Sequence, residues 1–327
     1  MVPRRDIQIL LATHNAGGYL DAQLASLRRQ DCAERIELLV RDDGSSDDTV
    51  ARLNRFDPGP LGLSIIPGDN LGVQGCFLEL MRAADRRADY FLFCDQDDVW
   101  ASGKVSAAVA ALTDTTRADP SAAAPTGTDS TGTDSTGPVL YCGRSIVTDA
   151  NLTPLGLTAP APRGPSFRNA LIQNIAPGHT MALTRPLLDL ACQTFDPARA
   201  IMHDHWVYLL AAGVGVVRFD PRPWTWYRTH AGNQIGYESN PVSHLLGRAR
   251  RLIGLDRGLY TRQVRALVER AGDRLPAAER ACAEAMVDQA TLGRRWRFLR
   301  AYPLVHQSHL AQVVASGLFL LGRYRDR

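Results

Sequence analysis

The stretch Tyr90-Phe91-Leu92-Phe93-Cys94-Asp95-Gln96-Asp97-Asp98-Val99-Trp100 joins an apolar run to three carboxylates within four residues. The apolar part is short, rich in aromatic residues and not alternating, which is typical of a strand buried on both faces. The carboxylates then lie at the carboxyl end of that strand, the edge at which open α/β sheets bind ligands. In extended backbone, Asp95 and Asp97 point to the same side. Two hard oxygen ligands in this arrangement suit Mg²⁺ or Mn²⁺, and the alternative is a solvated acidic turn.

The first hundred residues repeat a pattern of apolar strand, polar turn and amphipathic helix. Strands that alternate with helices imply a doubly wound α/β sheet, mostly parallel and flanked by helices. The expected strands are Ile7–Thr13, Ile36–Val40, Leu63–Ile66 and Tyr90–Cys94. The expected helices are Tyr19–Arg29, one from Asp47 or Asp48 through Phe56, and one within Leu71–Arg87.

Thr113–Pro138 interrupts the pattern, because it is rich in Thr, Ala, Ser, Asp, Gly and Pro and repeats Thr-Gly-Thr-Asp-Ser. We expect a disordered surface insertion there. The sheet domain is expected to span residues 1–240, with a helical extension over 241–327. The elements expected after the insertion are a strand at Val139–Ile146, a turn into a strand at Ala176–Leu183, a helix from about Arg185, a helix at His203–Ala212, and strands at Val214–Phe219 and Trp224–Arg228.

Cysteine and charge usage narrow the class of protein. Six scattered cysteines without a Cys-x-x-Cys pair indicate reduced thiols in a cytoplasmic protein. No segment reaches the roughly 18 uninterrupted apolar residues of a membrane helix. The chain carries +3 overall, but residues 241–327 hold 16 Arg against seven acidic residues, a net +9.

Four segments carry a resemblance to a known family. They are Leu11-Ala12-Thr13-His14-Asn15, Arg41-Asp42-Asp43-Gly44-Ser45-Ser46-Asp47-Asp48-Thr49, Asp95-Gln96-Asp97-Asp98 and His203-Asp204-His205-Trp206. Over about residues 5–235, their order and spacing resemble a glycosyltransferase of family 2 with the GT-A fold. The motif over residues 95–100 and the motif Tyr-Arg-Thr-His-Ala-Gly-Asn-Gln over 227–234 are similar to bacterial rhamnosyltransferases of surface-polysaccharide assembly.

The resemblance implies an inverting, metal-dependent transfer of one sugar, or a few, from a nucleotide-sugar donor to a hydroxyl. The first donor it suggests is dTDP-L-rhamnose, and UDP-sugars come next. The acceptor would be a saccharide or a lipid-linked saccharide. Two other classes stay open at this point. One is a nucleotide-sugar-binding protein without catalysis, and the other is a nucleotidyltransferase, although the turn after the first strand lacks the basic phosphate loop usual there.

The resemblance places the donor at the carboxyl ends of the first strands. Asp42 is expected to accept a hydrogen bond from the N3–H of uracil or thymine, with Thr13 and Asn15 lining the same pocket. The alternative is that Asp42 and Asp43 only form a tight turn with Gly44. The other residues expected to contact the donor are Asp43, Asn70, Asp95 and Gln96.

The resemblance also implies Mn²⁺ or Mg²⁺ as cofactor, which would offset charge on the departing diphosphate. Asp97 is expected to be the main metal ligand, with Asp95 reaching the ribose or the metal. His230 matches a histidine that completes the metal shell in related enzymes, and the alternative is a ring that is only packed or exposed. Zinc fits less well, because His203 and His205 have no further Cys and His residues at suitable spacing.

Transfer to a hydroxyl needs a general base. Asp204 matches the acidic residue that opens a helix and does this work in the family, where the usual Glu-Asp pair is here His203-Asp204. The alternative is a carboxylate that only favours the N-terminus of its helix. Gly178, His179 and Trp206 are expected to face the acceptor or the sugar, with an incidental His179 as the alternative.

The basic extension over residues 241–327 suggests a contact with a membrane surface. Residues 242–253 predict an amphipathic basic helix, and residues 310–321 form a short apolar stretch. Both suit a peripheral contact with an anionic membrane surface, at the inner face of the cell membrane. The alternative is helices packed on the sheet domain with their arginines in water. Nucleic acid is not an expected partner, because no nucleic-acid-binding motif accompanies the charge.

Overall fold

The computed structural model describes residues 6–114, 137–230 and 258–326. Most of the expected insertion Thr113–Pro138 and the whole expected helix at 242–253 lie outside these residues. Within them, no helix is long and apolar enough to cross a membrane.

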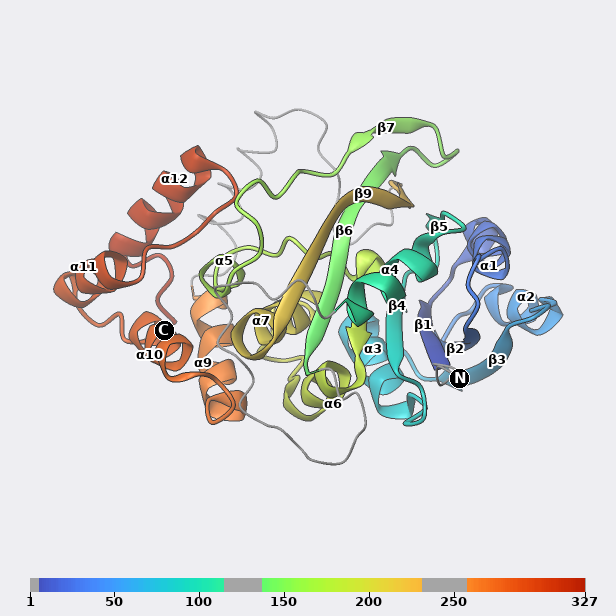
Figure 1. Ribbon diagram of the computed structural model, residues 1–327, viewed down its shortest axis with the longest axis horizontal. Coiled ribbons are helices and arrows are strands. Elements are labelled where there is room, and N and C mark those ends of the chain that lie inside the picture. Colours follow the sequence, from blue (N-terminus) through green and yellow to red (C-terminus); the bar gives the residue numbers. More distant parts are fainter. Residues whose placement is uncertain (1–5, 115–136, 231–257, 327) are drawn as a thin grey trace.

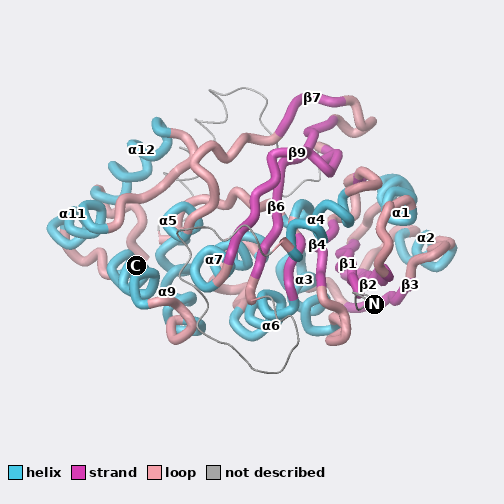
Figure 2. Tube along the Cα trace, in the orientation of Figure 1, coloured by secondary structure: helices cyan, strands magenta, loops and turns pink. Residues whose placement is uncertain are grey.

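One mixed sheet of nine strands runs through the middle of the described structure (Figures 1 and 2). Its order is β3-β2-β1-β4-β8-β6-β9-β5, with β7 beside β6. The half formed by β3, β2, β1 and β4 is parallel, as the alternation of strands and helices predicted. The other half mixes both directions. The strands are β1 (Asp6–Thr13), β2 (Arg35–Asp43), β3 (Gly62–Gly68), β4 (Tyr90–Cys94), β5 (Val99–Trp100), β6 (Val139–Thr148), β7 (Pro154–Leu157), β8 (Ala182–Thr184) and β9 (Val216–Arg228).

Two hydrophobic layers cover the two faces of the sheet, because successive strand residues point to opposite sides. Ile9 and Leu92 belong to the layer formed with α1, α2 and α4. Leu10 and Phe93, one residue further along, belong to the layer formed with α3, α6 and α7. The helices of the sheet domain are α1 (Leu20–Arg28), α2 (Thr49–Arg55), α3 (Gly72–Ala83), α4 (Lys104–Thr113), α5 (Phe167–Ala170), α6 (Arg185–Thr194) and α7 (His203–Val214), with single 3-10 turns η1 (Gly17–Tyr19) and η2 (Gly178–Thr180).

The C-terminal helices lie at the end of the molecule opposite to α1 and α2 (Figure 1). They are α9 (Leu259–Ala271), α10 (Ala277–Val287), α11 (Leu292–Ala301) and α12 (His309–Leu320). Their buried residues, such as Leu267 and Phe319, share one hydrophobic cluster with Phe77 and Leu210 of the sheet domain. A helical C-terminal region is therefore confirmed. The division at residue 240 stays a prediction.

Two local expectations differ from the structure. The strands expected at Val214–Phe219 and Trp224–Arg228 form the single strand β9, because a shift in its pairing with β6 between Asp220 and Pro223 absorbs the irregular residues. The turn Asp95–Asp98 is bent rather than extended. The expectation that Asp95 and Asp97 point to the same side assumed extended backbone, so it does not apply here. The two side chains contact different partners.

Candidate active site

Asp42 lies at the carboxyl end of β2 and is only 2% exposed. Its carboxylate accepts hydrogen bonds from the Ser45 backbone N–H (2.9 Å), the Ser45 hydroxyl (2.6 Å) and the Thr13 hydroxyl (3.1 Å). These bonds fold the Asp42–Ser45 turn against the end of β1. The contact between Asp42 and a base stays a prediction, and any such contact must use the lone pair that these three donors leave.

Asp43 is buried beside Asp42 but contacts a different part of the structure. It forms an ion pair with Arg41 and accepts a hydrogen bond from the Leu71 backbone N–H at 2.9 Å. Asn70, the residue before Leu71, is exposed, and its amide nitrogen lies 3.3 Å from Nε2 of His14. Asp43 thus fixes the loop that leads into α3, and this loop brings Asn70 to the same edge as β1.

Gln96 and His14 join the ends of β4 and β1. The Gln96 side chain accepts from the His14 N–H (2.7 Å) and donates to the His14 carbonyl (3.0 Å). Asn15 follows with φ 46°, a left-handed conformation that asparagine tolerates. Its side-chain oxygen accepts from the Ser46 N–H at 2.8 Å. Thr13, Asn15, Asp42, Asp43, Asn70 and Gln96, all expected on the donor side, are therefore held near one another by hydrogen bonds to their neighbours.

Asp97 and His230 form a close pair. Nε2 of His230 lies 2.8 Å from Oδ2 of Asp97, and the His230 ring stacks on Tyr19 at 4.7 Å. Arg228, at the end of β9, donates from Nε to the Asp97 carbonyl and from its backbone N–H to Oδ1 of Asp98. The last residues of β9 therefore hold the acidic turn that follows β4, although the two segments are far apart in the sequence.

A second group forms on the other side of this turn. One ligand atom from each of Asp95, Asp98 and His179 lies within 4.8 Å of the others. Nδ1 of His179 is 3.8 Å from Oδ2 of Asp95 and 3.9 Å from Oδ2 of Asp98, too far for hydrogen bonds. Nε2 of His179 lies 2.8 Å from the Ser145 hydroxyl, and the ring stacks on Tyr227. Asp98 does not cap a helix, because it is wholly buried and α4 begins at Lys104.

The electrostatics of the turn favour a cation. Burial and the nearby carboxylates of Asp97 and Asp204 raise the pKa of Asp95 to about 7. Burial, Asp97 and Asp95 raise the pKa of Asp98 well above its usual range. Oδ2 of Asp98 has no hydrogen-bond partner among the described residues. Several carboxylates held together with an unpaired buried oxygen fit a hard divalent cation such as Mg²⁺ or Mn²⁺.

Asp204 opens α7 and approaches the same turn from the other side of the sheet edge. Its Oδ2 accepts a hydrogen bond from the Gly178 N–H at 3.1 Å, and its Oδ1 accepts from the His205 N–H at 2.6 Å. Burial raises the pKa of Asp204 to about 6, although these N–H groups favour the carboxylate. A carboxyl group with this pKa, near neutrality, is suited to accept a proton.

The two histidines beside Asp204 are buried. His203 packs face to face with Phe77 at 4.0 Å, and neither ring nitrogen has a partner among the described residues. Burial lowers its pKa to about 3, so the ring is neutral. His205 lies 2.7 Å from the Ala170 carbonyl. With both rings turned into the protein, this pair does not form a zinc site.

The position of Trp206 corrects an expectation. Its side chain is wholly buried, and its indole N–H donates to the Thr194 hydroxyl at 3.2 Å. It therefore packs α7 against α6 and does not face an acceptor. Gly178 and His179 do lie at the site, in η2. Gly178 packs closely there, because a Cβ would lie 3.0 Å from Nε2 of His203 and would press on that ring.

Sequence reasoning missed several residues that shape the site. Lys104 donates a hydrogen bond to the His179 carbonyl, and Ser145 fixes the His179 ring. Tyr19 stacks on His230, and the Arg228 guanidinium lies 4.7 Å from the centre of the Tyr19 ring. Arg228 had a signal, since it precedes Thr-His in the motif over 227–234. The others come from distant segments and carry no local pattern.

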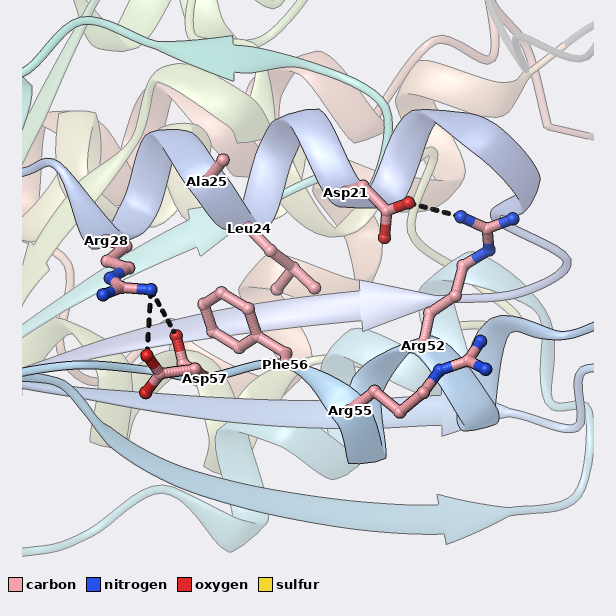
Figure 3. A pocket seen from close by; sticks show the side chains of 8 residues that line it. All are labelled: Asp21, Leu24, Ala25, Arg28, Arg52, Arg55, Phe56 and Asp57. Atoms are coloured by element: carbon pink, nitrogen blue, oxygen red, sulfur yellow. Dashed lines mark hydrogen bonds and ion pairs between the residues drawn. The ribbon is translucent and has the colours of Figure 1, made fainter.

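A surface pocket between α1 and α2 is separate from this edge (Figure 3). Arg28 pairs with Asp57, and Arg52 pairs with Asp21. The residues that line this pocket are Asp21, Leu24, Ala25, Arg28, Arg52, Arg55, Phe56 and Asp57. None of the residues discussed above lines it.

Part of this chain matches known glycosyltransferases in sequence. Residues 8–147 match the model of the family described as glycosyl transferase family 2. A stretch of 106 residues, 31% of this chain, is 31% identical to the dTDP-rhamnosyl transferase RfbG of Shigella flexneri. The match spans 36% of that relative, so only about a third of its length is compared.

Two solved structures resemble the whole chain. The mannosyltransferase PcManGT from Pyrobaculum calidifontis, in complex with GDP-Man and Mn²⁺, has a TM-score of 0.54 at 18% identity, over 98% of this chain and 86% of that one. S. aureus TarS 1-349 in complex with UDP-GlcNAc has a TM-score of 0.53 at 14% identity, over 98% of this chain and 89% of that one. At these identities the likeness concerns the fold.

The expected GT-A architecture, a mixed α/β sheet with flanking helices and a helical C-terminal region, is thereby confirmed. Residues 8–147 thus match glycosyl transferase family 2, the family that the motifs resemble.

Proposed function

We propose that the protein transfers a sugar from a nucleotide-sugar donor to a hydroxyl group, with inversion at the anomeric carbon. One observation carries this proposal. The acidic turn Asp95–Asp98 and the carboxylate of Asp204 both lie against η2, since His179 is 3.8 Å from Asp95 and the Gly178 N–H donates to Asp204 at 3.1 Å. The site therefore combines a place for a cation and a diphosphate with a separate proton acceptor.

The donor would lie along the ends of β1, β2 and β4. Thr13, Asn15 and Asp42 would contact the base, while Asn70, Asp43, Asp95 and Gln96 shape the ribose and diphosphate side. Asp97, Asp95 and His230 would hold Mg²⁺ or Mn²⁺. The Asp97–His230 separation of 2.8 Å fits this role, since adjacent ligands of an octahedral ion lie about 3 Å apart. When bound, the cation would offset charge on the leaving diphosphate.

Asp204 would act as the general base. As the acceptor oxygen forms its bond to the anomeric carbon, its proton passes to Asp204 and the bond to the diphosphate breaks. One displacement of this kind inverts the configuration. Gly178 and Asp204 are joined by a hydrogen bond, so η2 would set where the acceptor hydroxyl lies relative to the base.

The proposed donor is dTDP-L-rhamnose, because the subfamily motifs and the dTDP-rhamnosyl transferase relative agree. UDP-sugars are the alternative. A thermal-shift screen of nucleotide sugars with Mn²⁺ tests this choice. A ligand at 100 times its Kd stabilises by about 2.7 kcal/mol, enough to rank donors. Release of dTDP from dTDP-L-rhamnose would then separate an enzyme from a protein that only binds nucleotide sugars. Stabilisation by UDP-sugars alone would overturn the donor assignment.

We also propose that α11 and α12 contact an anionic membrane, where a lipid-linked acceptor would be found. Trp296, Leu310, Val313 and Leu321 are exposed there, and from residue 289 to 326 six Arg accompany one acidic residue. Each basic side chain near such a surface contributes about 1 kcal/mol at most, and salt screens it.

Flotation with liposomes tests this contact. Binding to anionic vesicles should fall in Val313→Ser and at high salt. Leu155→Ser, which changes an exposed leucine on β7, should leave it unchanged. Equal flotation with neutral and anionic liposomes would contradict the proposal.

A further inference from the structure

Lys104 is the single lysine in the sequence, and it is 1% exposed. It begins α4, and its side chain enters the protein beneath the acidic turn. The ammonium group donates a hydrogen bond to the His179 carbonyl, and Nζ lies 3.3 Å from the centre of the Trp100 ring. Lysine is almost never fully buried without a partner. The surroundings of Lys104 therefore indicate a specific task.

The cost of burying this lysine is offset by groups of the active site. Burial lowers the pKa of Lys104 to about 7, while Cys94, Asp98 and Asp95 favour its charged form. A methionine would fill a similar volume without this cost. A methionine would lack both the charge near Asp98 and Asp95 and the hydrogen bond to the His179 carbonyl, and only the bond reaches η2. That bond is the feature to explain.

The carbonyl that accepts from Lys104 belongs to His179 in η2. The preceding residue of η2, Gly178, contacts Asp204, the proposed general base. The Gly178 N–H donates to Oδ2 of Asp204 at 3.1 Å. Within the turn, the Thr180 hydroxyl and N–H both donate to the Pro177 carbonyl, at 2.8 and 2.9 Å. One short, internally bonded turn is thus anchored by Lys104 and in turn orients Asp204. A shift at its anchored carbonyl would move the Gly178 N–H.

We propose that Lys104 is a positioning residue that fixes η2 and, through the Gly178 N–H, the carboxylate of Asp204. This inference rests on the proposed role of Asp204 as general base. The orientation of the Asp204 carboxylate would then depend on a residue of α4, the helix that follows the acidic turn in the chain.

Lys104→Met tests the inference, with Val109→Ala as the matched control. Val109 is a buried residue of the same helix, so its truncation weakens α4 without touching η2. The readouts are dTDP release from dTDP-L-rhamnose with water as acceptor, and the Kd of dTDP with Mn²⁺. We expect kcat to fall about 10- to 100-fold in Lys104→Met, because small misplacements cost that much. The Kd of dTDP should change less than about threefold, and Val109→Ala should keep the native kcat.

A folded Lys104→Met variant with native kcat would overturn the inference, and so would an equal loss of kcat in Val109→Ala. Thr180→Val supplies a second test that keeps Lys104. It removes the hydroxyl bond inside η2 and should lower kcat with unchanged dTDP affinity. Native kcat in Thr180→Val would contradict the inference even if Lys104→Met does not fold. If the native protein releases no nucleoside diphosphate from any nucleotide sugar, the proposed function fails instead.

Discussion

The proposed donor and acceptor halves of the site are built differently. On the proposed donor half, Asp42, Asp43 and Gln96 are all engaged in hydrogen bonds to neighbouring backbone or side chains. On the proposed acceptor half, neither ring nitrogen of His203 has a partner within the described ranges, and Oδ2 of Asp98, in the turn between the halves, also has none there. The donor half is therefore fixed before any ligand binds. The acceptor half keeps costly polar groups close to the proposed chemistry, as functional sites often do.

Asp97 lies between the two halves, and its loss should have the largest effect. Asp97→Ala should abolish transfer and remove the dependence of dTDP binding on metal, because it deletes the main proposed ligand. Calorimetry of dTDP with and without Mn²⁺ measures this. Asp57→Ala, a change at an exposed carboxylate between α2 and β3, serves as the control. Metal-dependent affinity that survives in Asp97→Ala would move the cation to the Asp95–Asp98–His179 group.

On the acceptor half, Asp204→Asn should lower kcat by about 10²–10⁴-fold, the usual contribution of a general base. The amide has nearly the same shape but can keep only one of the bonds from the Gly178 and His205 N–H groups. Because neither group belongs to the proposed donor side, the Kd of the donor should change little. Steady-state kinetics together with donor titration give both numbers. Equal loss of donor binding would make Asp204 a donor or metal ligand. Near-native turnover would place the base elsewhere.

The same carboxylate-to-amide change on the donor half should affect binding instead. In Asp42→Asn, the amide oxygen can keep the bond from the Ser45 N–H while the NH₂ group donates to the Ser45 and Thr13 hydroxyls, which accept as well as donate. What is lost is the negative charge, so the remaining oxygen becomes a weaker acceptor for the proposed contact with the base. We expect a weaker Kd for dTDP and a kcat that changes less than in Asp204→Asn. If the two variants show the same pattern, the contrast between the halves is wrong.

The pH dependence should follow the acceptor half. The pKa of Asp204 is about 6, so kcat should fall about tenfold per pH unit below that value, as a base becomes protonated. The folded state binds this proton more tightly than the unfolded chain. Protonation of Asp204 therefore stabilises the fold as the pH falls from about 6 towards 4, and this contribution is lost as the pH rises through 6. A pH profile of kcat at saturating donor, with a flat acid limb, would contradict the assignment.

The smallest expected effect is a gain in stability. His203→Phe replaces an unpaired buried ring between Phe77 and Phe93 by an apolar ring of similar shape. Removing an unsatisfied polar group in this way is neutral to stabilising. We expect a gain of about 1 kcal/mol, which is roughly 2–4 °C in Tm. A loss of stability in a melting experiment would show that His203 has a hydrogen bond in solution.

Several features of the fold follow from short-range pattern. The runs at Ile7–Thr13 and Tyr90–Cys94 are apolar throughout and end at polar turns, which marks buried strands and the functional edge. These two runs are β1 and β4, and they pair directly in parallel, as expected for strands that are connected through helices. The donor-side motif Arg41–Thr49 is continuous, so its turn is determined by neighbouring residues.

The sequence by itself indicated the family resemblance, determined the parallel half of the sheet and supplied the candidate site residues, because contiguous motifs encode local turns and strand ends. Only the tertiary structure decided which carboxylate meets which partner. Asp97 meets His230 and Asp95 faces His179 because the acidic turn bends and the end of β9 holds it through Arg228. The tertiary structure also buries Trp206 against α6, away from the proposed acceptor side, and places the Lys104 ammonium within hydrogen-bond distance of η2. These contacts join segments roughly 75 or more residues apart, apart from the short Trp206–Thr194 link, and packing, rather than local pattern, selects them.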